Sequence, residues 1–92
     1  MFEWDIQKAI TNYEKHGVSF EEAVTAFSDP NGLDGEDIAH SQHEHRRQRL
    51  AQSISGRILL VIYTIKRRDH EKEIIRLISA RQASRKERQA YA

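Results

Sequence analysis

The spacing of apolar and polar residues predicts a helix near the start of the chain. Its apolar positions recur at the helical period and are Ile6, Ala9, Ile10 and Tyr13. Asp5 precedes them as a favourable N-cap. Gly17 follows them at the position where a left-handed residue commonly ends a helix. We therefore expect a helix between Asp5 and Gly17.

A second helix is predicted directly afterwards. Ser19 and Glu22 have the spacing of a capping box, in which each side chain bonds the other residue's backbone amide. Ala23 and Phe27 continue the apolar side of this helix, and the turn-forming residues 29–32 end it.

The pattern then changes to that of strands. Three segments are rich in β-branched residues or alternate between apolar and polar: 47–54, 57–65 and 73–80. The second is almost continuously apolar and is expected at the centre of a sheet. Ser55 and Gly56 predict a hairpin turn, and the charged residues 66–72 predict a loop. Residues 33–38 fit either a short strand or a loop, and the polar stretch up to residue 46 predicts an exposed connection.

The chain ends in a second capping box, formed by Ser84 and Glu87, which predicts a short C-terminal helix. This helix is almost entirely charged, so we expect its stability to depend on a partner. Two helices, three or four antiparallel strands and a short helix together predict an α+β fold. The helices are expected to cover one sheet face and to leave the other open.

Length and composition narrow the class of protein. A chain of 92 residues predicts a single domain over 1–92, and the lack of cysteine excludes disulfides and thiol nucleophiles. No apolar run approaches the roughly 18 residues that a membrane helix needs. The first residues do not resemble a signal peptide. We expect a soluble cytoplasmic protein that has no membrane partner.

Charge is divided unevenly along the chain. Residues 1–45 contain two cations and ten acids, whereas residues 46–92 contain thirteen cations and four acids. This division predicts a basic surface for a polyanion, and arginine, the commonest cation here, suits phosphate. The alternative is that the two halves neutralise each other across the fold.

Arg76 lies in the middle of an apolar strand, where an unpaired guanidinium is costly. Either it forms a salt bridge with an acid of the first half, or it binds an anion on the open sheet face. Strict alternation places Ser79 on the face opposite to Arg76. The same strand ends near Arg81, which leads into the basic C-terminal segment.

These residue types suit RNA cleavage without a cofactor, in which the 2′-hydroxyl attacks the adjacent phosphate. Lys8 and the arginines would bind phosphate, and His16 or Tyr63 would transfer protons. The structural alternatives are a helix-terminal cation for His16 and a core aromatic for Tyr63. Residues His40, His43 and His45 have the spacing of a metal site, but no further ligand completes it. The tail from Arg85 is either a solvated face or a nucleic-acid contact.

Several ordered segments resemble the BrnT family of type II toxins. They are Phe2-Glu3-Trp4-Asp5 with Lys8; Lys15-His16-Gly17-Val18-Ser19-Phe20-Glu21-Glu22-Ala23; Phe27 with Asp29-Pro30; His40-Ser41; Gly56-Arg57-Ile58-Leu59 through Tyr63-Thr64; Arg76-Leu77-Ile78-Ser79-Ala80-Arg81; and Ser84-Arg85-Lys86-Glu87-Arg88. The resemblance implies a compact RelE-like α+β fold and metal-independent endoribonuclease activity, without cofactors, that inhibits translation. Motif matching implies that the catalytic candidates are His16, Arg76, Arg81, Lys8, Ser79 and Tyr63. The RNA-binding candidates are Arg57, Arg85, Lys86 and Arg88.

The resemblance also implies partners. A BrnA-like antitoxin would neutralise the toxin in a hetero-oligomer, in which an antitoxin dimer holds a toxin pair and binds operator DNA. Natural targets for the antitoxin are the basic sheet face and the last helix. The alternative function is a catalytically degenerate module that binds the antitoxin and takes part in operator autoregulation.

Overall fold

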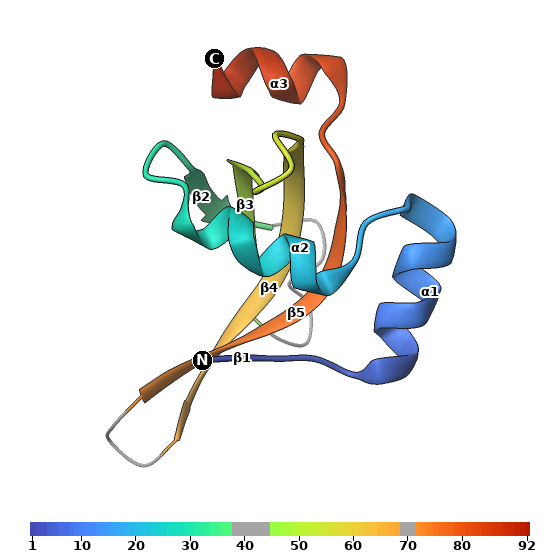
Figure 1. The fold of residues 1–92 in the computed structure, drawn as a ribbon. Coiled ribbons are helices and arrows are strands. Elements are labelled where there is room, and N and C mark those ends of the chain that lie inside the picture. The colour runs from blue at the N-terminus through green and yellow to red at the C-terminus, as the bar shows by residue number, and fades with distance from the viewer. Residues whose placement is uncertain (38–44, 69–71) are drawn as a thin grey trace.

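The computed structural model describes residues 1–37, 45–68 and 72–92. Within these residues, three α-helices and a short 3-10 helix accompany five strands (Figure 1). Their bounds in chain order are β1 (Phe2–Glu3), α1 (Ile6–His16), α2 (Phe20–Thr25), η1 (Ala26–Ser28), β2 (Leu33–Glu36), β3 (Arg47–Gln52), β4 (Ile58–Arg68), β5 (Lys72–Gln82) and α3 (Arg85–Tyr91). The predicted α+β class is confirmed, but a short strand precedes the two N-terminal helices and a 3-10 helix follows them.

The strands form one sheet in the order β1-β5-β4-β3-β2. The pairs β2–β3, β3–β4 and β4–β5 are antiparallel, but β1 runs parallel to β5. The expectation of three or four antiparallel strands is therefore wrong in number and in type. Strand β1 has only two residues, and β2 contains a glycine and two acids, so neither carries a recognisable strand pattern.

The hairpin of β4 and β5 is longer than its apolar pattern. The predicted loop 66–72 is wrong at both ends, because β4 continues to Arg68 and β5 begins at Lys72. Arg67 and Glu73 face each other across the two strands and form an ion pair with an N–O distance of 3.1 Å. Cross-strand ion pairs of this kind let a charged sequence continue the ladder.

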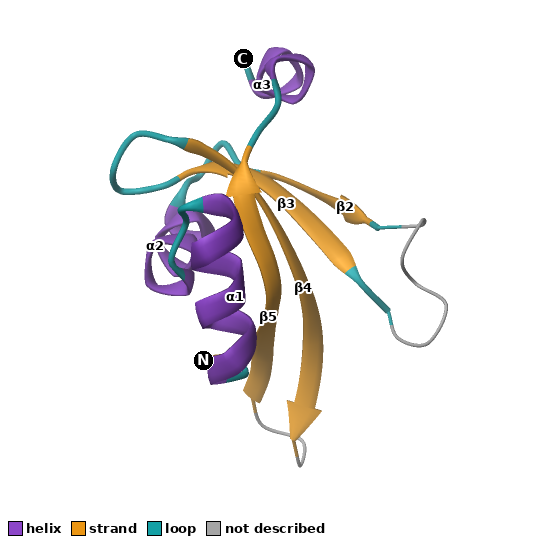
Figure 2. Cartoon of the chain, turned by 90° about the vertical axis from the view of Figure 1, so that its right-hand side faces the viewer, coloured by secondary structure: helices purple, strands orange, loops and turns teal. Residues whose placement is uncertain are grey.

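Helices α1 and α2 pack on one face of the sheet (Figure 2). The core beneath them is formed by Val18, Phe20, Ala23, Leu59, Val61, Tyr63, Leu77 and Ala80. The expectation that the opposite face is open is wrong at one end, because α3 lies across it there. There Tyr91 packs against a smaller cluster of Leu50, Leu60 and Ala83.

The caps agree with the sequence at three of four points. Asp5 accepts hydrogen bonds from the backbone of Gln7 and Lys8, and Gly17 ends α1 at φ 67°. The capping box of α3 is complete. The box of α2 is only half formed, because the Glu22 carboxylate bonds distant residues instead of the Ser19 amide.

A bulge in the β4–β5 pairing decides which side chains share the α3-covered face. Ile62 is opposite Ser79 while Tyr63 is opposite Leu77, so Ile78 is an extra residue. The bulge moves Ser79 and Arg81 to the same face as Arg76. The expectation that Ser79 lies on the other face is therefore wrong, because strict alternation does not hold across a bulge.

No helix in the described part of the chain has the length and apolarity needed to cross a membrane.

Candidate active site

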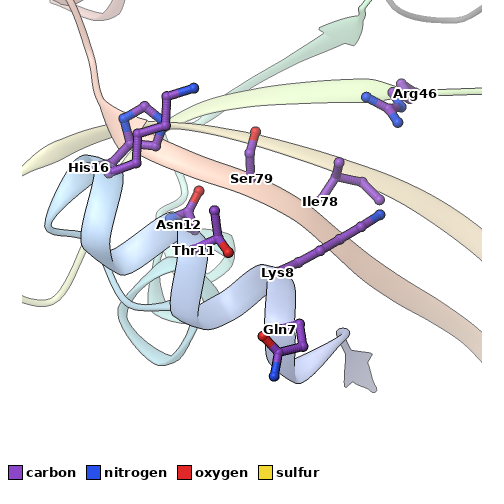
Figure 3. A pocket seen from close by; sticks show the side chains of 9 residues that line it. Gln7, Lys8, Thr11, Asn12, His16, Arg46, Ile78 and Ser79 are labelled. Carbon is purple, nitrogen blue, oxygen red and sulfur yellow. The ribbon is translucent and has the colours of Figure 1, made fainter.

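A pocket of about 430 Å³ lies between one face of α1 and strand β5 (Figure 3). Its lining is Gln7, Lys8, Thr11, Asn12, Lys15, His16, Arg46, Ile78 and Ser79. Figure 3 shows Lys8 extending from α1 toward Ile78, with Ser79 rising from β5 beside them. Three of the sequence-predicted candidates, Lys8, His16 and Ser79, thus line one pocket.

A second pocket of about 330 Å³ shares Arg46 and Ser79 with the first. It is lined by Asp37, Arg46, Gln48, Leu60, Ile62, Ser79, Arg81 and Glu87. The two shared residues place the pockets side by side, and we call the two together the joined pocket, to which the second contributes Arg81. Four candidates from distant parts of the chain therefore border the same region.

Helix α1 supplies Lys8 and Lys15 to the first pocket, because its helical repeat places both side chains on one face. Lys8, Asn12 and Lys15 are spaced i, i+4 and i+7, so they lie on one face of the helix. Lys15 and His16 are in the last turn, where the partial negative charge of the helix end favours cations. The Asp5 cap and Gly17 set where this helix begins and ends, and so they set the place of these side chains.

Asn12 joins α1 to β5. Its side-chain amide donates hydrogen bonds to the carbonyl oxygens of Val18 (3.0 Å) and Ala80 (2.8 Å), and its oxygen accepts one from the Ala80 amide (3.0 Å). Asn12 is 5% exposed. A single side chain thus satisfies both backbone groups of a β5 residue that lies between Ser79 and Arg81, and it fixes α1 against the strand.

Three residues of this region were missed from the sequence: Asn12, Lys15 and Arg46. Lys15 has a signal, because it is two residues before Gly17, in the last turn of the helix, and seven residues after Lys8. Asn12 has no such signal, because an amide side chain inside a helix is common. Arg46 precedes β3 in a polar stretch whose path the sequence does not indicate.

Arg81 is held by the C-terminal helix. Its two terminal nitrogens donate to the two Glu87 oxygens at 2.8 and 2.9 Å, a two-pronged pairing. These hydrogen bonds lower the pKa of Glu87 to about 2. A carboxylate therefore occupies the donor fork that would suit a phosphate.

Arg76 lies on the same sheet face but does not line either pocket. It donates to a Glu3 oxygen at 2.8 Å, and Lys66 lies 3.4 Å from the same oxygen. The hydrogen bond from Arg76 is the main reason that the pKa of Glu3 is lowered. Of the two alternatives for Arg76, the salt bridge is the one observed.

Tyr63 and Arg57 lie on the α2-covered face, apart from the pocket. The Tyr63 hydroxyl donates to Asp34 at 2.6 Å, and burial raises its pKa. Arg57 pairs with Glu22 and donates to the Gly17 carbonyl oxygen at 3.1 Å. Tyr63 therefore links β4 to β2, and Arg57 links the start of β4 to α2 and to the end of α1.

The basic residues of α3 lie near the second pocket, because Glu87 of the same helix lines it. Arg85 and Lys86 are exposed, and Arg88 donates to the Ala83 carbonyl oxygen at 2.9 Å. These positions are compatible with a long polyanion that extends beyond the pocket.

The histidine cluster falls mostly outside the described residues, since His40 and His43 lie in the segment 38–44. His45 pairs with Glu36 at 3.2 Å. Among residues 1–37, 45–68 and 72–92, no three histidine or acidic side chains are grouped closely enough to hold a metal ion.

A family model described as the ribonuclease toxin BrnT of type II toxin–antitoxin systems matches residues 4–87. The fold is similar to the crystal structure of the Brucella abortus ribonuclease toxin BrnT, with a TM-score of 0.57 and 24% identity, covering 92% of this chain and 99% of that chain. Comparison with curated proteins gives no match. Because the family model covers nearly the whole chain, this protein belongs to the BrnT family, the ribonuclease toxins of type II toxin–antitoxin systems.

Proposed function

We propose that this toxin is an endoribonuclease that cuts RNA without a metal ion, by attack of the substrate's own 2′-hydroxyl on the adjacent phosphorus. The supporting observation is the joined pocket, where Lys8, Lys15 and Arg46 line one part together with His16, and Arg81 lines the adjoining part. In this reaction the nucleophile belongs to the substrate. The protein therefore has only to transfer protons and to stabilise charge on phosphorus.

The roles follow from side-chain chemistry. The 2′-oxygen bonds to phosphorus and loses its proton, and the bond to the 5′-oxygen breaks as that oxygen gains a proton. This leaves a 2′,3′-cyclic phosphate and a 5′-hydroxyl. His16 transfers protons, because histidine is the side chain suited to this task near neutral pH. Lys8 and Arg81 stabilise the phosphorane charge, with Ser79 as a hydrogen-bond donor.

The remaining candidates take other roles in this proposal. Arg76, Arg85, Lys86 and Arg88 contact RNA on either side of the cleaved bond, because they lie on the same sheet face or on α3. Tyr63 and Arg57 have structural roles, since the Tyr63 hydroxyl bonds Asp34 of β2 and the Arg57 guanidinium bonds Glu22 and the Gly17 carbonyl oxygen. RNA must compete with Glu87 for Arg81.

Membership of the family implies an antitoxin partner. The rest of the cellular account belongs to the proposal: cleavage occurs in the cytoplasm and blocks translation. A BrnA-like antitoxin dimer holds two toxin chains and binds operator DNA.

The test uses the purified chain, a short end-labelled RNA and the same RNA with a single 2′-deoxy sugar at the mapped cut. We expect cleavage that persists in EDTA, leaves cyclic phosphate ends and stops at the deoxy position. Loss of activity in EDTA, or cleavage 3′ to a deoxy sugar, contradicts the mechanism. Antitoxin binding without any RNA cleavage would instead support the degenerate module.

A further inference from the structure

We infer that a groove on the outer side of α1 is the docking site for an amphipathic helix of the antitoxin, one whose apolar face is flanked by lysine or arginine. The inference rests on the pairing with an antitoxin, which family membership implies.

The groove borders a stripe of exposed apolar side chains. Ile6, Ile10 and Tyr13 are 71%, 48% and 59% exposed and are spaced i, i+4 and i+7 along α1. They are the positions that predicted the apolar side of this helix, yet they face outward. An apolar stripe with this spacing is typical of a surface that receives a partner helix.

The groove itself has a volume of about 440 Å³ and lies between α1 and the start of α2. Its wall includes Trp4 and Phe20, whose rings meet edge to face at a centroid distance of 5.8 Å. Phe20 is fully buried, so this wall is anchored in the core. The concavity is therefore built on a rigid part of the protein, and an apolar side chain that enters it meets aromatic surface.

Charge at the rim selects the partner. Glu14 and Glu21 line the groove, and neither forms an ion pair within the described part of the chain. Two carboxylates beside an apolar slot favour lysine or arginine at the flanks of the incoming helix and repel an acidic one. An acidic partner would be better placed on the basic sheet face, so the rim gives the groove a different specificity.

The position of the groove separates binding from catalysis. The pocket and the groove are lined by different residues of α1 and share none. Eleven helical residues span about 16 Å, which matches two to three turns of a partner helix. A helix docked here contacts the element that carries His16 without covering Ser79. Variants of the groove should therefore lose the antitoxin and keep RNA cleavage.

The first test replaces Ile10 or Tyr13 by aspartate in the full chain and measures affinity for the purified cognate antitoxin. We expect I10D and Y13D to weaken binding at least about 30-fold, as for central interface residues. The control is Ile54→Asp, an apolar residue that is 84% exposed in the turn between β3 and β4 and outside the groove. We expect it to bind like the wild type. Unchanged binding by I10D and Y13D overturns the inference.

A second measurement tests the charge. Glu14→Lys and Glu21→Lys together should weaken binding about ten-fold at low salt and much less at high salt. Equal or tighter binding overturns the basic partner helix. Light scattering of the free toxin provides a further check: if I10D abolishes a toxin dimer and leaves antitoxin affinity unchanged, the groove is a contact between toxin copies and the inference fails.

RNA cleavage is recorded for every variant. A wild type that cuts no RNA defeats the proposed function, but the affinity measurements still decide the docking site. Thermal melting confirms that each variant is folded, since all the changed side chains are on the surface or the groove rim.

Discussion

At the residue scale, Tyr63 shows how a catalytic residue type can belong to the core. Its ring packs edge to face on Phe27 with centroids 5.1 Å apart, and its hydroxyl donates to Asp34. Arg47 also approaches the same oxygen, at 3.4 Å. These contacts place the hydroxyl in a network on the α2-covered face, so we assign it no proton transfer.

Replacing Tyr63 by phenylalanine should therefore leave RNA cleavage unchanged. The free energy of unfolding should fall by about 1 kcal/mol, because Asp34 loses one hydrogen bond. Urea unfolding and a cleavage assay with labelled RNA check the two parts. Loss of cleavage in a folded Y63F protein would return Tyr63 to the active site.

The Glu22 carboxylate makes the stability of the folded protein depend on pH. Bonds from Arg57, together with the hydroxyls of Ser53 and Ser55, lower its pKa from 4.5 to about 2. Because the folded pKa is below the unfolded one, its contribution is fully present above about pH 4.5. It is lost as the pH falls toward 2. The pair is partly exposed, at 15% and 30%, so we discount the full shift to about 2 kcal/mol.

The variant Glu22→Gln should accordingly be about 2 kcal/mol less stable than the wild type at pH 7, and this gap should shrink to roughly a quarter of that value at pH 2.5. Glu21→Gln is the matched control, because the Glu21 carboxylate, next to Glu22 in the sequence, makes none of these bonds. Urea unfolding at both pH values measures the difference. A stability gap that stays constant with pH would contradict the assignment.

At the scale of elements, Asn12 and the bulge at Ile78 set the geometry of the candidate site. Asn12 binds α1 to β5, and the bulge turns Ser79 and Arg81 to the sheet face that α3 reaches. Neither feature has a pattern in the sequence. An amide inside a helix and one extra residue in an apolar strand look like ordinary variation until the partners are known.

Asn12→Ala leaves both Ala80 backbone groups without their partner and should cost about 2–3 kcal/mol. We also expect cleavage to slow at least ten-fold, because the α1 cations lose their fixed distance from Ser79. Val61→Ala is the control, since this fully buried core residue costs about 2 kcal/mol without touching the pocket. If both folded variants cleave equally well, Asn12 has only a structural role.

Helix α3 places a carboxylate on Arg81. Glu87→Gln removes this competitor, so RNA should bind several-fold more tightly by fluorescence anisotropy. The melting temperature should fall, because the cap of α3 and the ion pair are both weakened. Glu73→Gln changes the net charge equally at an exposed pair far along the hairpin and should alter neither property much. Weaker RNA binding by E87Q would contradict the competition.

At the scale of the whole molecule, the two alternatives for the charge division do not exclude each other. Ion pairs join the halves, as in Glu3 with Arg76, Glu22 with Arg57 and Asp34 with Arg49. Other cations gather at the joined pocket, and acids rim the groove on α1. Neutralisation and a basic site therefore coexist, because the chain crosses between helices and sheet several times.

The sequence was sufficient for the helices, the central hairpin and the family, because apolar periods, caps and spaced motifs are local signals. It was insufficient for β1, for the face of Ser79 and for the exclusion of Arg76 and Tyr63 from the pocket. Those features depend on pairing partners far away in the chain. Lys8, His16, Ser79 and Arg81 remain the proposed catalytic group, and Arg46 joins them from the structure.

The role of His16 in proton transfer is tested by the single-turnover cleavage rate of His16→Gln. The control is His45→Gln, which changes an exposed histidine outside the pocket. We expect H16Q to cut RNA at least about 100-fold more slowly, with RNA affinity changed less than about three-fold, since proton transfer and not binding is lost. H45Q should behave like the wild type. A folded H16Q protein that cleaves RNA at the wild-type rate would contradict the account.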